Sequence, residues 1–220
     1  MLSVMKGKVI VMVNDRILAL CELSNDLLYD KIPEGKISYY VDSSLAAGRA
    51  AAKEYTGMDI KKLYHSNNIQ IEYRKESKGS FGVMLRGQVV LGKDESKVEL
   101  YSSSIESLAN NSQIYGSAPI SYDLALNIHL AHEFFHFLEY KSNNFVSDQL
   151  DSVVIMKIFG FQRLAHIKRC SEIAAHGFAK ELLHLQYLPN LYDYAYLINT
   201  GKMTEKDLSD MMSRMESILG

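Results

Sequence analysis

Two histidines and a glutamate stand close together in the segment His132-Glu133-Phe134-Phe135-His136. In a helix, side chains four residues apart lie on the same face, so His132 and His136 would point the same way with Glu133 beside them. Imidazoles in this arrangement bind a divalent metal ion, and the glutamate handles the proton of a water molecule that the ion activates. The pattern therefore predicts a zinc-dependent hydrolase.

The segment that contains this motif, Ser121 to Lys141, is apolar on almost every helical face, which predicts a buried helix. A single buried histidine can simply be hydrogen-bonded within a core. Two histidines and a glutamate on one buried face would instead leave several polar groups uncompensated, and a bound cation removes that cost. We therefore expect these three side chains to line a metal site.

A catalytic zinc ion needs a third protein ligand and keeps its fourth position for water. The metzincin class of peptidases would require Gly at position 139 and His at position 142, whereas this chain has Glu139 and Ser142. In the gluzincin class, the third zinc ligand is a glutamate on a separate downstream helix. Glu172 fits it, because Ala175 and Ala179 share its helical face and would let that helix approach the motif helix closely.

The motif HEFFH, followed about thirty-five residues later by SEIAAHGFAKELL, resembles the ImmA/IrrE family of zinc metallopeptidases, over roughly residues 42 to 186. The resemblance implies that His132, His136 and Glu172 bind zinc and that Glu133 is the catalytic acid and base. It also implies a protein substrate, because this family cleaves helix-turn-helix repressors in mobile-element induction and in stress responses.

The chain departs from the family pattern at two points. The family usually has Asn or Asp where this chain has His176, and that side chain often supports a ligating histidine. His176 could instead be an alternative ligand or an oxyanion donor, and we place it with Glu133 among the candidate catalytic residues. Many family members also carry a fused helix-turn-helix domain. None is evident here, so a repressor partner would be a separate chain.

Further polar side chains could complete the site. The donor for the oxyanion is open between four candidates: His176, His166, Tyr115 and Tyr122. His129 precedes His132 by one helical turn, and we expect it to be a hydrogen-bonded core histidine or a support for a ligand rather than a ligand itself. Glu139 could orient the imidazole of His136 or be a surface charge.

The length, charge and cysteine content limit the classes of protein to which this chain could belong. A chain of 220 residues fits one compact domain, or one domain with a helical appendage, and its net charge of −2 gives no electrostatic reason to expect direct nucleic-acid binding. No apolar run approaches the ~18–20 residues that cross a membrane, so we expect no membrane partner. Only Cys21 and Cys170 are present, which favours a reduced, cytoplasmic setting.

The residue pattern predicts an α+β fold. Gly7 to Leu23 is typical of a strand leading into a short apolar segment, and Asp42 to Tyr55 of a helix capped by Asp42 or Ser43. A short helical turn is expected from Asp59 to His65. Alternating apolar residues then predict a small antiparallel sheet with four candidate strands: Ile69–Tyr73, Phe81–Leu85, Gln88–Leu91 and Lys97–Tyr101.

From Ser121 the chain is predicted to be mostly helical to its end. Gly160 should break the segment after the motif helix, and Arg163 to Leu185 should form one long helix. Thr204 to Asp207 resembles a capping box that starts the last helix. We expect the apolar stripe of that helix to pack on the protein's own body. Its members are Leu208, Met211, Met212, Met215 and Leu219.

These elements suggest three parts: an N-terminal extension (residues 1–41) packed on the core, a zincin-like metallopeptidase domain (42–187) and a helical C-terminal appendage (188–220). In the middle part the sheet packs on the buried motif helix and on further helices. The function expected is a zinc-dependent intracellular endopeptidase that cleaves a regulatory protein of the repressor type. A non-proteolytic, metal-stabilised regulatory or binding protein of the same fold is the alternative, since it would carry the same motif.

Overall fold

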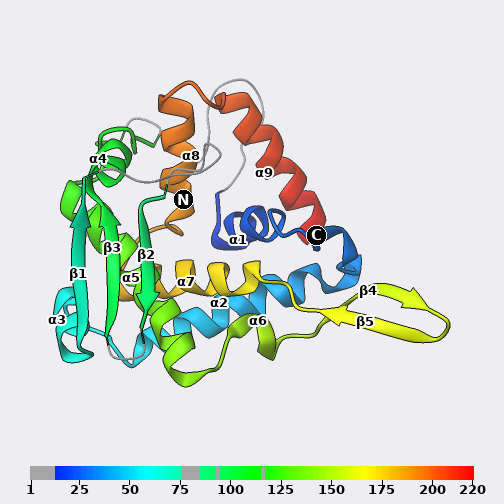
Figure 1. The fold of residues 1–220 in the computed structure, drawn as a ribbon. Helices are drawn as coiled ribbons and strands as arrows, with labels where there is room; N and C mark the ends of the chain where they lie inside the picture. The colour runs from blue at the N-terminus through cyan, green and yellow to red at the C-terminus, as the bar shows by residue number, and fades with distance from the viewer. Residues whose placement is uncertain (1–12, 76–84, 93–94, 115–116) are drawn as a thin grey trace.

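The computed structural model describes residues 13–75, 85–92, 95–114 and 117–220. Many helices and two small sheets make up this part of the chain, so the α+β class is confirmed (Figure 1). The three-stranded sheet has the order β1 (Ile69–Arg74), β3 (Ser96–Tyr101), β2 (Gly87–Leu91). The second sheet is a hairpin of β4 (Val153–Ile158) and β5 (Phe161–Ala165).

The α-helices make up most of the described chain. They are α1 (Asp15–Leu23), α2 (Ile37–Lys53), α3 (Ile60–Ser66), α4 (Ser102–Asn110), α5 (Tyr122–Ser142), α6 (Val146–Gln149), α7 (Arg169–Leu182), α8 (Asn190–Asn199) and α9 (Glu205–Leu219). Helix α7 packs against both α2 and α5, and α5 also packs against β2. In Figure 1 the three-stranded sheet stands at one end of this helical layer, and the β4–β5 hairpin projects from the other end.

Several helix starts follow from side-chain caps. The hydroxyl of Ser121 accepts a hydrogen bond from the Leu124 amide and begins α5, which contains the HEFFH motif. Asp59 caps α3 in the same way. The capping box expected at the last helix is confirmed, because the side chains of Thr204 and Asp207 bond to each other's backbone amides.

The N-terminal predictions need correction. The apolar segment that should follow a strand is helix α1, capped by Asn14, while residues 7–12 of the predicted strand lie outside the described residues. The next helix, α2, begins at Ile37 rather than at Asp42 or Ser43. Its buried face starts earlier than the predicted cap, and the Asp42 carboxylate forms an ion pair with Arg16 instead. This helix crosses the expected boundary between residues 41 and 42.

The sheet is mixed rather than antiparallel. Strand β2 is antiparallel to β3, but β1 runs parallel to β3, with Ile69 opposite Ser96. Alternation along a strand reports which face is buried and carries no information on the direction of the neighbouring strand. The candidate strand Phe81–Leu85 lies largely outside the described residues, and Leu85 itself is not in a strand.

The predicted helix Arg163–Leu185 is wrong in its first part. Residues 161–165 form β5, and helix α7 begins only at Arg169. Gly160 is the turn of the hairpin that joins β4 to β5, with a φ of 86°, so its position marks a reversal rather than a helix break. The mostly helical character after Ser121 otherwise holds.

The last helix packs on the body of the protein, as expected. Leu208 and Met212 are buried, and Met211, Met215 and Leu219 pack against the core from partly buried positions. Helix α9 makes these contacts mainly with α1. One hydrophobic cluster runs from Val13 to Met212. Among the described residues, no helix has the length and apolar character needed to cross a membrane.

Candidate metal centre

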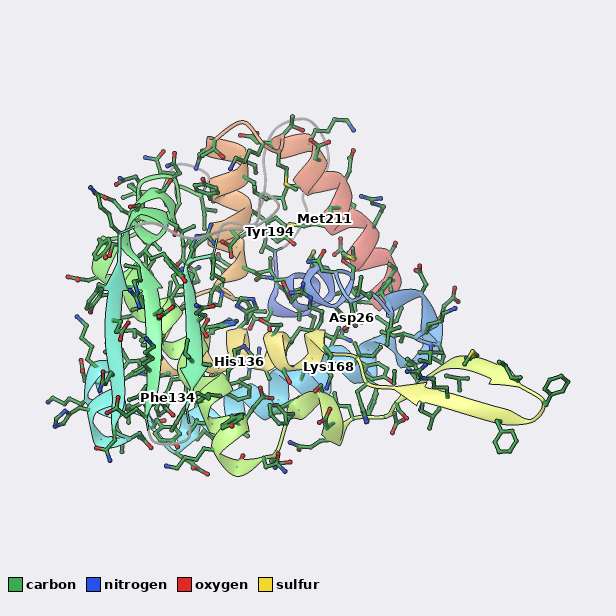
Figure 2. The ribbon with its side chains drawn as sticks, viewed as in Figure 1. Asp26, Phe134, His136, Lys168, Tyr194 and Met211 are labelled. Atoms are coloured by element: carbon green, nitrogen blue, oxygen red, sulfur yellow. The ribbon has the colours of Figure 1, made fainter. Side chains whose placement is uncertain are left out.

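Helix α5 presents the motif as the sequence predicts. It is buried along most of its length, and Ala131, Phe134 and Phe135 carry the apolar packing around the motif. His132 and His136 lie one turn apart, and their Nε2 atoms face each other at 3.2 Å. Figure 2 places His136 close to helix α7, which carries Glu172.

Glu172 joins the two histidines. Its Oε2 lies 3.2 Å from His132 Nε2, and its Oε1 lies 3.6 Å from His136 Nε2. One ligand atom from each of the three side chains lies within 4.8 Å of the others, which is close enough for all three to hold a metal ion. The structure therefore brings together the two helices that the sequence analysis linked.

Small residues allow this approach on both sides of α7. Ala175 and Ala179 are fully buried. On the α2 side, a Cβ atom added to Gly48 would lie only 2.0 Å from the carbonyl oxygen of Ala174. The backbones of α2 and α7 are thus nearly in contact, and α2 supports the helix that carries Glu172 from behind.

Glu139 is buried and oriented, so the surface-charge alternative is excluded. Its Oε2 lies 3.1 Å from His136 Nδ1. Its Oε1 accepts hydrogen bonds from the amide of Val146 and from the hydroxyl of Ser171, both at 2.8 Å. Since Glu139 engages Nδ1, the Nε2 atom of His136 is the one that faces His132 and Glu172.

Glu133 reaches from α5 to the edge strand β2. Its Oε2 accepts a hydrogen bond of 2.9 Å from the backbone amide of Val89. The contact is close, because a Cβ atom at Gly87 would lie 3.4 Å from Glu133 Cγ. Its other oxygen makes no hydrogen bond within the described ranges. The Glu133 carboxylate therefore lies between helix α5 and strand β2, which is an edge strand of the sheet as described.

The electrostatics of the cluster favour a cation. Burial lowers the pKa of His136, but hydrogen bonds to Glu139 and Glu172 outweigh burial and raise this pKa to about 10. Burial raises the pKa of Glu172, yet hydrogen bonds from His132 and His136 hold it well below its usual value. The field of these carboxylates thus stabilises positive charge between them, which is what a metal site requires.

His176 lies beside the cluster without joining it. Its ring centroid is 4.9 Å from that of His132, and its buried Nδ1 has no hydrogen-bond partner in the described part of the chain. Burial and the neighbouring His132 lower the pKa of His176 to about 3, so its imidazole is neutral near pH 7. A neutral imidazole can donate one hydrogen bond to a reacting group.

His129 is also separate from the three clustered side chains. Burial is the main reason that its pKa lies well below the usual value, and the charge of Arg86 lowers it further. We expected a hydrogen-bonded core histidine or a support for a ligand here, and the buried Nε2 of His129 finds no hydrogen-bond partner among the residues described.

Of the other oxyanion candidates, His166 and Tyr122 are placed less favourably. Tyr122 begins helix α5, ten residues before His132 and so about 15 Å away along the axis at ~1.5 Å per residue. His166 lies between β5 and α7, and no contact with the cluster is found for it in the described residues. Tyr115 falls outside them.

An ion pair that residue patterns do not predict lies next to the cluster. Arg169, one turn before Glu172, binds Glu22 of α1 at 2.7 Å. Burial raises the pKa of Glu22, Arg169 opposes that effect, and the charge of Glu172 adds to it. The two partners are 147 residues apart in the chain, and neither stands in a recognisable motif. No local signal could have found them.

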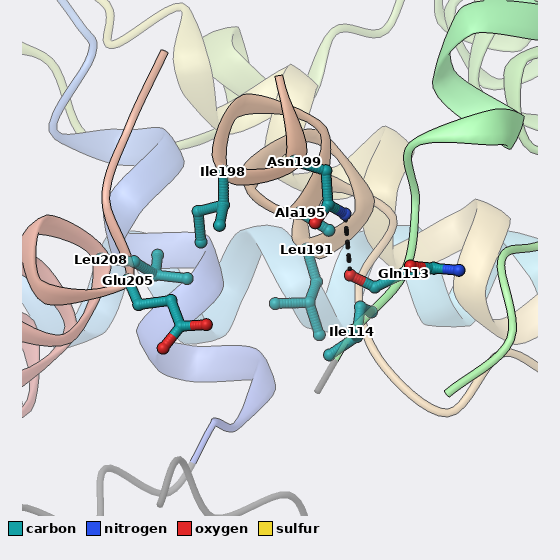
Figure 3. Close-up of a pocket in the computed structure, with 8 residues that line it drawn as sticks. All are labelled: Gln113, Ile114, Leu191, Ala195, Ile198, Asn199, Glu205 and Leu208. Atoms are coloured by element: carbon teal, nitrogen blue, oxygen red, sulfur yellow. Dashed lines mark hydrogen bonds between the residues drawn. The ribbon is translucent and has the colours of Figure 1, made fainter. Parts of the chain in front are cut away.

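A separate cavity of about 160 Å³ lies between α8, α9 and the loop after α4 (Figure 3). Ile114, Leu191 and Leu208 give it apolar walls, and Asn199 donates a hydrogen bond of 3.1 Å to the carbonyl of Gln113 at its rim. None of the clustered side chains lines it, so it is not part of the candidate metal centre.

Comparison of the chain with protein-family models, with curated proteins and with solved structures found no match. The functional argument therefore depends on the geometry of the cluster and on the motifs in the sequence.

Proposed function

We propose that this protein is a zinc-dependent endopeptidase with a zincin-like fold. The observation that carries the proposal is the convergence of His132, His136 and Glu172, with Glu133 next to the cluster on the same helix. Two histidines and one carboxylate are the protein ligands of one class of catalytic zinc sites, and a set of three leaves a position for water.

The distances support a tetrahedral ion. Zinc bonds to histidine nitrogen and carboxylate oxygen are about 2.0–2.2 Å long, so ligand atoms around a tetrahedral zinc lie roughly 3.4 Å apart. In this chain, His132 Nε2 lies 3.2 Å from His136 Nε2, and the two distances from these atoms to the Glu172 carboxylate are 3.2 and 3.6 Å. The two carboxylate distances run to different oxygens, Oε2 from His132 and Oε1 from His136, so the side chains lie near these separations, with one ligand atom from each within 4.8 Å of the others.

When bound, zinc supplies a Lewis acid that acidifies water and polarises a carbonyl group. Glu133 is the general base in this scheme, and its unbonded oxygen takes the proton of the attacking water and passes it to the leaving amine. The bond from Val89 to the other oxygen orients the carboxylate. Glu139 holds the ligating tautomer of His136. His176, neutral and next to His132, is the best-placed oxyanion donor of the three candidates within the described residues.

The resemblance of HEFFH and SEIAAHGFAKELL to the ImmA/IrrE family supports a regulatory protein as the substrate, of the helix-turn-helix repressor type. The repressor would be a separate chain. The competing function is a metal-stabilised regulatory protein that holds such a partner without cutting it. The hydrogen bond between Glu133 and Val89 is the observation that favours this alternative, because it also gives the carboxylate a structural role.

The variant Glu133→Gln separates the two functions. The zinc-loaded protein is incubated with candidate helix-turn-helix repressors from the same genome, and cleavage is followed by mass spectrometry. The glutamine can still accept the Val89 hydrogen bond but cannot take a proton, so we expect cleavage to fall by at least about a hundredfold with zinc content and thermal unfolding unchanged.

Glu181→Gln is the matched control, because Glu181 is an exposed residue outside the cluster. This variant should cleave like the wild type. A Glu133→Gln protein that cuts the repressor as fast as the wild type would rule out Glu133 as the base. A wild-type protein that binds both zinc and repressor without cleavage would support the binding function instead.

A further inference from the structure

The β4–β5 hairpin extends away from the body of the protein (Figure 1). Its turn consists of Phe159 and Gly160, and β5 begins with Phe161. Phe159 is 99% exposed and Phe161 is 83% exposed, although burial of either ring would lower the free energy of the protein in water. Packing within the protein does not explain why two phenylalanines are exposed to solvent at the end of the hairpin. Exposed apolar groups of this kind often mark an interaction site.

The backbone conformation of the turn is also unfavourable for a phenylalanine. Phe159 has a φ of 46° and Gly160 a φ of 86°, so both turn residues adopt the left-handed conformation. Turns of this type favour Asn or Asp followed by Gly, and a bulky side chain at the first position is strained. The backbone of Phe159 therefore opposes folding, and its exposed ring contributes no burial free energy to offset that cost. A residue that breaks a local rule without a structural gain is a candidate for function.

The side chains change from apolar at the turn to positively charged farther along the hairpin. Ile158 is paired with Phe161 directly behind the turn, then Lys157 with Gln162, then Met156 with Arg163. Neighbouring residues in a strand point to opposite faces, so Lys157 and Arg163 lie on opposite faces of the ribbon. At about 3.3 Å per residue, both cations lie within ~7 Å of the apolar end.

Apolar side chains also occupy both faces. Met156, Ile158 and Leu164 are all exposed, and Leu164 points away from the face that carries Met156 and Arg163. Residues 152–171 contain no Asp or Glu. Within the described ranges Lys157 and Arg163 have no acidic partner. The end of the ribbon is thus apolar on every side and positively charged just behind.

We propose that the tip of the hairpin docks on an anionic lipid surface. Apolar segments that bind membranes from one side enter the interface to a depth of about 5–10 Å, and lysine and arginine then reach the phosphate level. The observed order of groups fits this depth. A protein groove would cover one face of the ribbon, whereas a fluid interface surrounds both faces and the turn.

The sequence analysis expected no membrane partner, but that expectation concerned segments long enough to span a bilayer. A docked hairpin needs no such segment. The proposal is also independent of the peptidase function, since the hairpin contains none of the clustered side chains.

The chain contains no tryptophan, which allows a clean optical test. The variant Phe159→Trp places a single indole at the tip, and Leu27→Trp places one at an equally exposed position elsewhere, since Leu27 is also 99% exposed. Each protein is mixed with vesicles of three parts phosphatidylcholine to one part phosphatidylserine. We expect the emission of Phe159→Trp to shift to shorter wavelength and that of Leu27→Trp to stay unchanged.

Vesicles of phosphatidylcholine alone, or added salt, should weaken the shift, because the attraction between Lys157, Arg163 and anionic lipid is screened or absent. No shift of Phe159→Trp, or an equal shift of both variants, would overturn the proposal. An equal shift on both kinds of vesicle would overturn the requirement for anionic lipid.

Co-sedimentation with the same vesicles tests the otherwise unlabelled protein. Phe159→Asn creates the preferred Asn-Gly turn, so it should keep or raise thermal stability while reducing vesicle affinity roughly tenfold or more. Leu27→Asn removes an equally exposed apolar side chain elsewhere and should sediment like the wild type. If Phe159→Asn sedimented as well as the wild type, the tip would not be the docking element.

Discussion

At the level of single residues, Glu139 determines which nitrogen of His136 faces the cluster. Its carboxylate engages Nδ1, and the amide of Val146 and the hydroxyl of Ser171 fix the carboxylate in turn. Such a partner holds the ring in its ligating orientation and makes the imidazole a better ligand. Glu139 is therefore a positioning residue, which would act on a bound metal ion through His136.

The variant Glu139→Gln tests this role. An amide in this position is a weaker acceptor than a carboxylate, so we expect zinc affinity to fall about 10- to 100-fold. Competition with a chromophoric chelator measures this affinity. The exposed Glu181→Gln serves as the control and should bind zinc like the wild type. Equal affinity of Glu139→Gln and wild type would show that Glu139 has only a packing role.

The metal-free protein should lose stability in alkali through His136. Its pKa is raised to about 10 in the folded state, above the value of 6.5 for an unperturbed histidine, so the folded protein binds this proton more tightly. The stabilisation is complete below the unfolded pKa and is lost as pH rises through the folded one. The free energy of unfolding should therefore decrease between about pH 6.5 and about pH 10.

Chemical denaturation in the presence of a chelator measures this decrease. Other groups titrate in the same window, so the comparison is with His136→Gln, which lacks the ionisable ring. We expect the wild type to lose more stability than this variant over the same pH range. Parallel curves for the two proteins would contradict the stabilising role of the protonated ring.

Much of the candidate site follows from residue spacing. The spacing of His132 and His136 places them on one helical face. The helical face that contains Glu172 also carries small residues, which allow a neighbouring helix to pack closely. The role of Glu139 remained open because burial at the end of α5 depends on α6 and α7, which only the folded chain brings there. The Glu22–Arg169 pair is a contact between distant segments, which spacing cannot reveal.

At the level of elements, the pair α2 and α7 supports the candidate centre. Gly48 has almost no space around its Cα, since a Cβ atom would lie 2.0 Å from the carbonyl oxygen of Ala174 and 2.9 Å from the amide nitrogen of Phe178. Both neighbouring atoms belong to a helix backbone, which cannot move aside locally. Helix α7 carries Glu172, so its distance from α2 also sets the position of that carboxylate.

The substitution Gly48→Ala should therefore be destabilising. Alanine normally stabilises a helix relative to glycine by about 1 kcal/mol, but overpacking costs about 1–3 kcal/mol or more, and here the clash is with backbone. We expect a net loss of stability in urea denaturation and weaker zinc retention. Gly35→Ala is the control, because nothing lies within 4 Å of its added Cβ. A stabilised Gly48→Ala protein would contradict the close helix pair.

Helices whose starts are marked by capping residues could be predicted from the sequence. Strands whose direction depends on a distant neighbouring strand could not. Ser121 and the capping box at Thr204 mark helix starts in the sequence itself. The direction of β1 is set by its pairing with β3, and no residue pattern encodes it. The predicted helix Arg163–Leu185 wrongly includes residues 163–165 of β5, because short apolar runs suit either state.

At the level of the whole molecule, one hydrophobic cluster includes residues from the first described helix to the last. Val13 and Met212 belong to the same cluster, and α9 packs on α1. The candidate centre lies between α5 and α7 within this structure, so a metal ion held there would join two helices of one core. Ligands that bind only the folded state stabilise the whole chain.

Zinc content per chain tests the central claim most directly. The protein is loaded with zinc and dialysed against a chelator, and the metal is then measured by atomic emission. The wild type and Glu181→Ala should each retain about one zinc ion per chain, whereas Glu172→Ala, which keeps only His132 and His136, should retain far less. If Glu172→Ala retained as much zinc as the wild type, Glu172 would not be a ligand and the proposed three-residue site would be wrong.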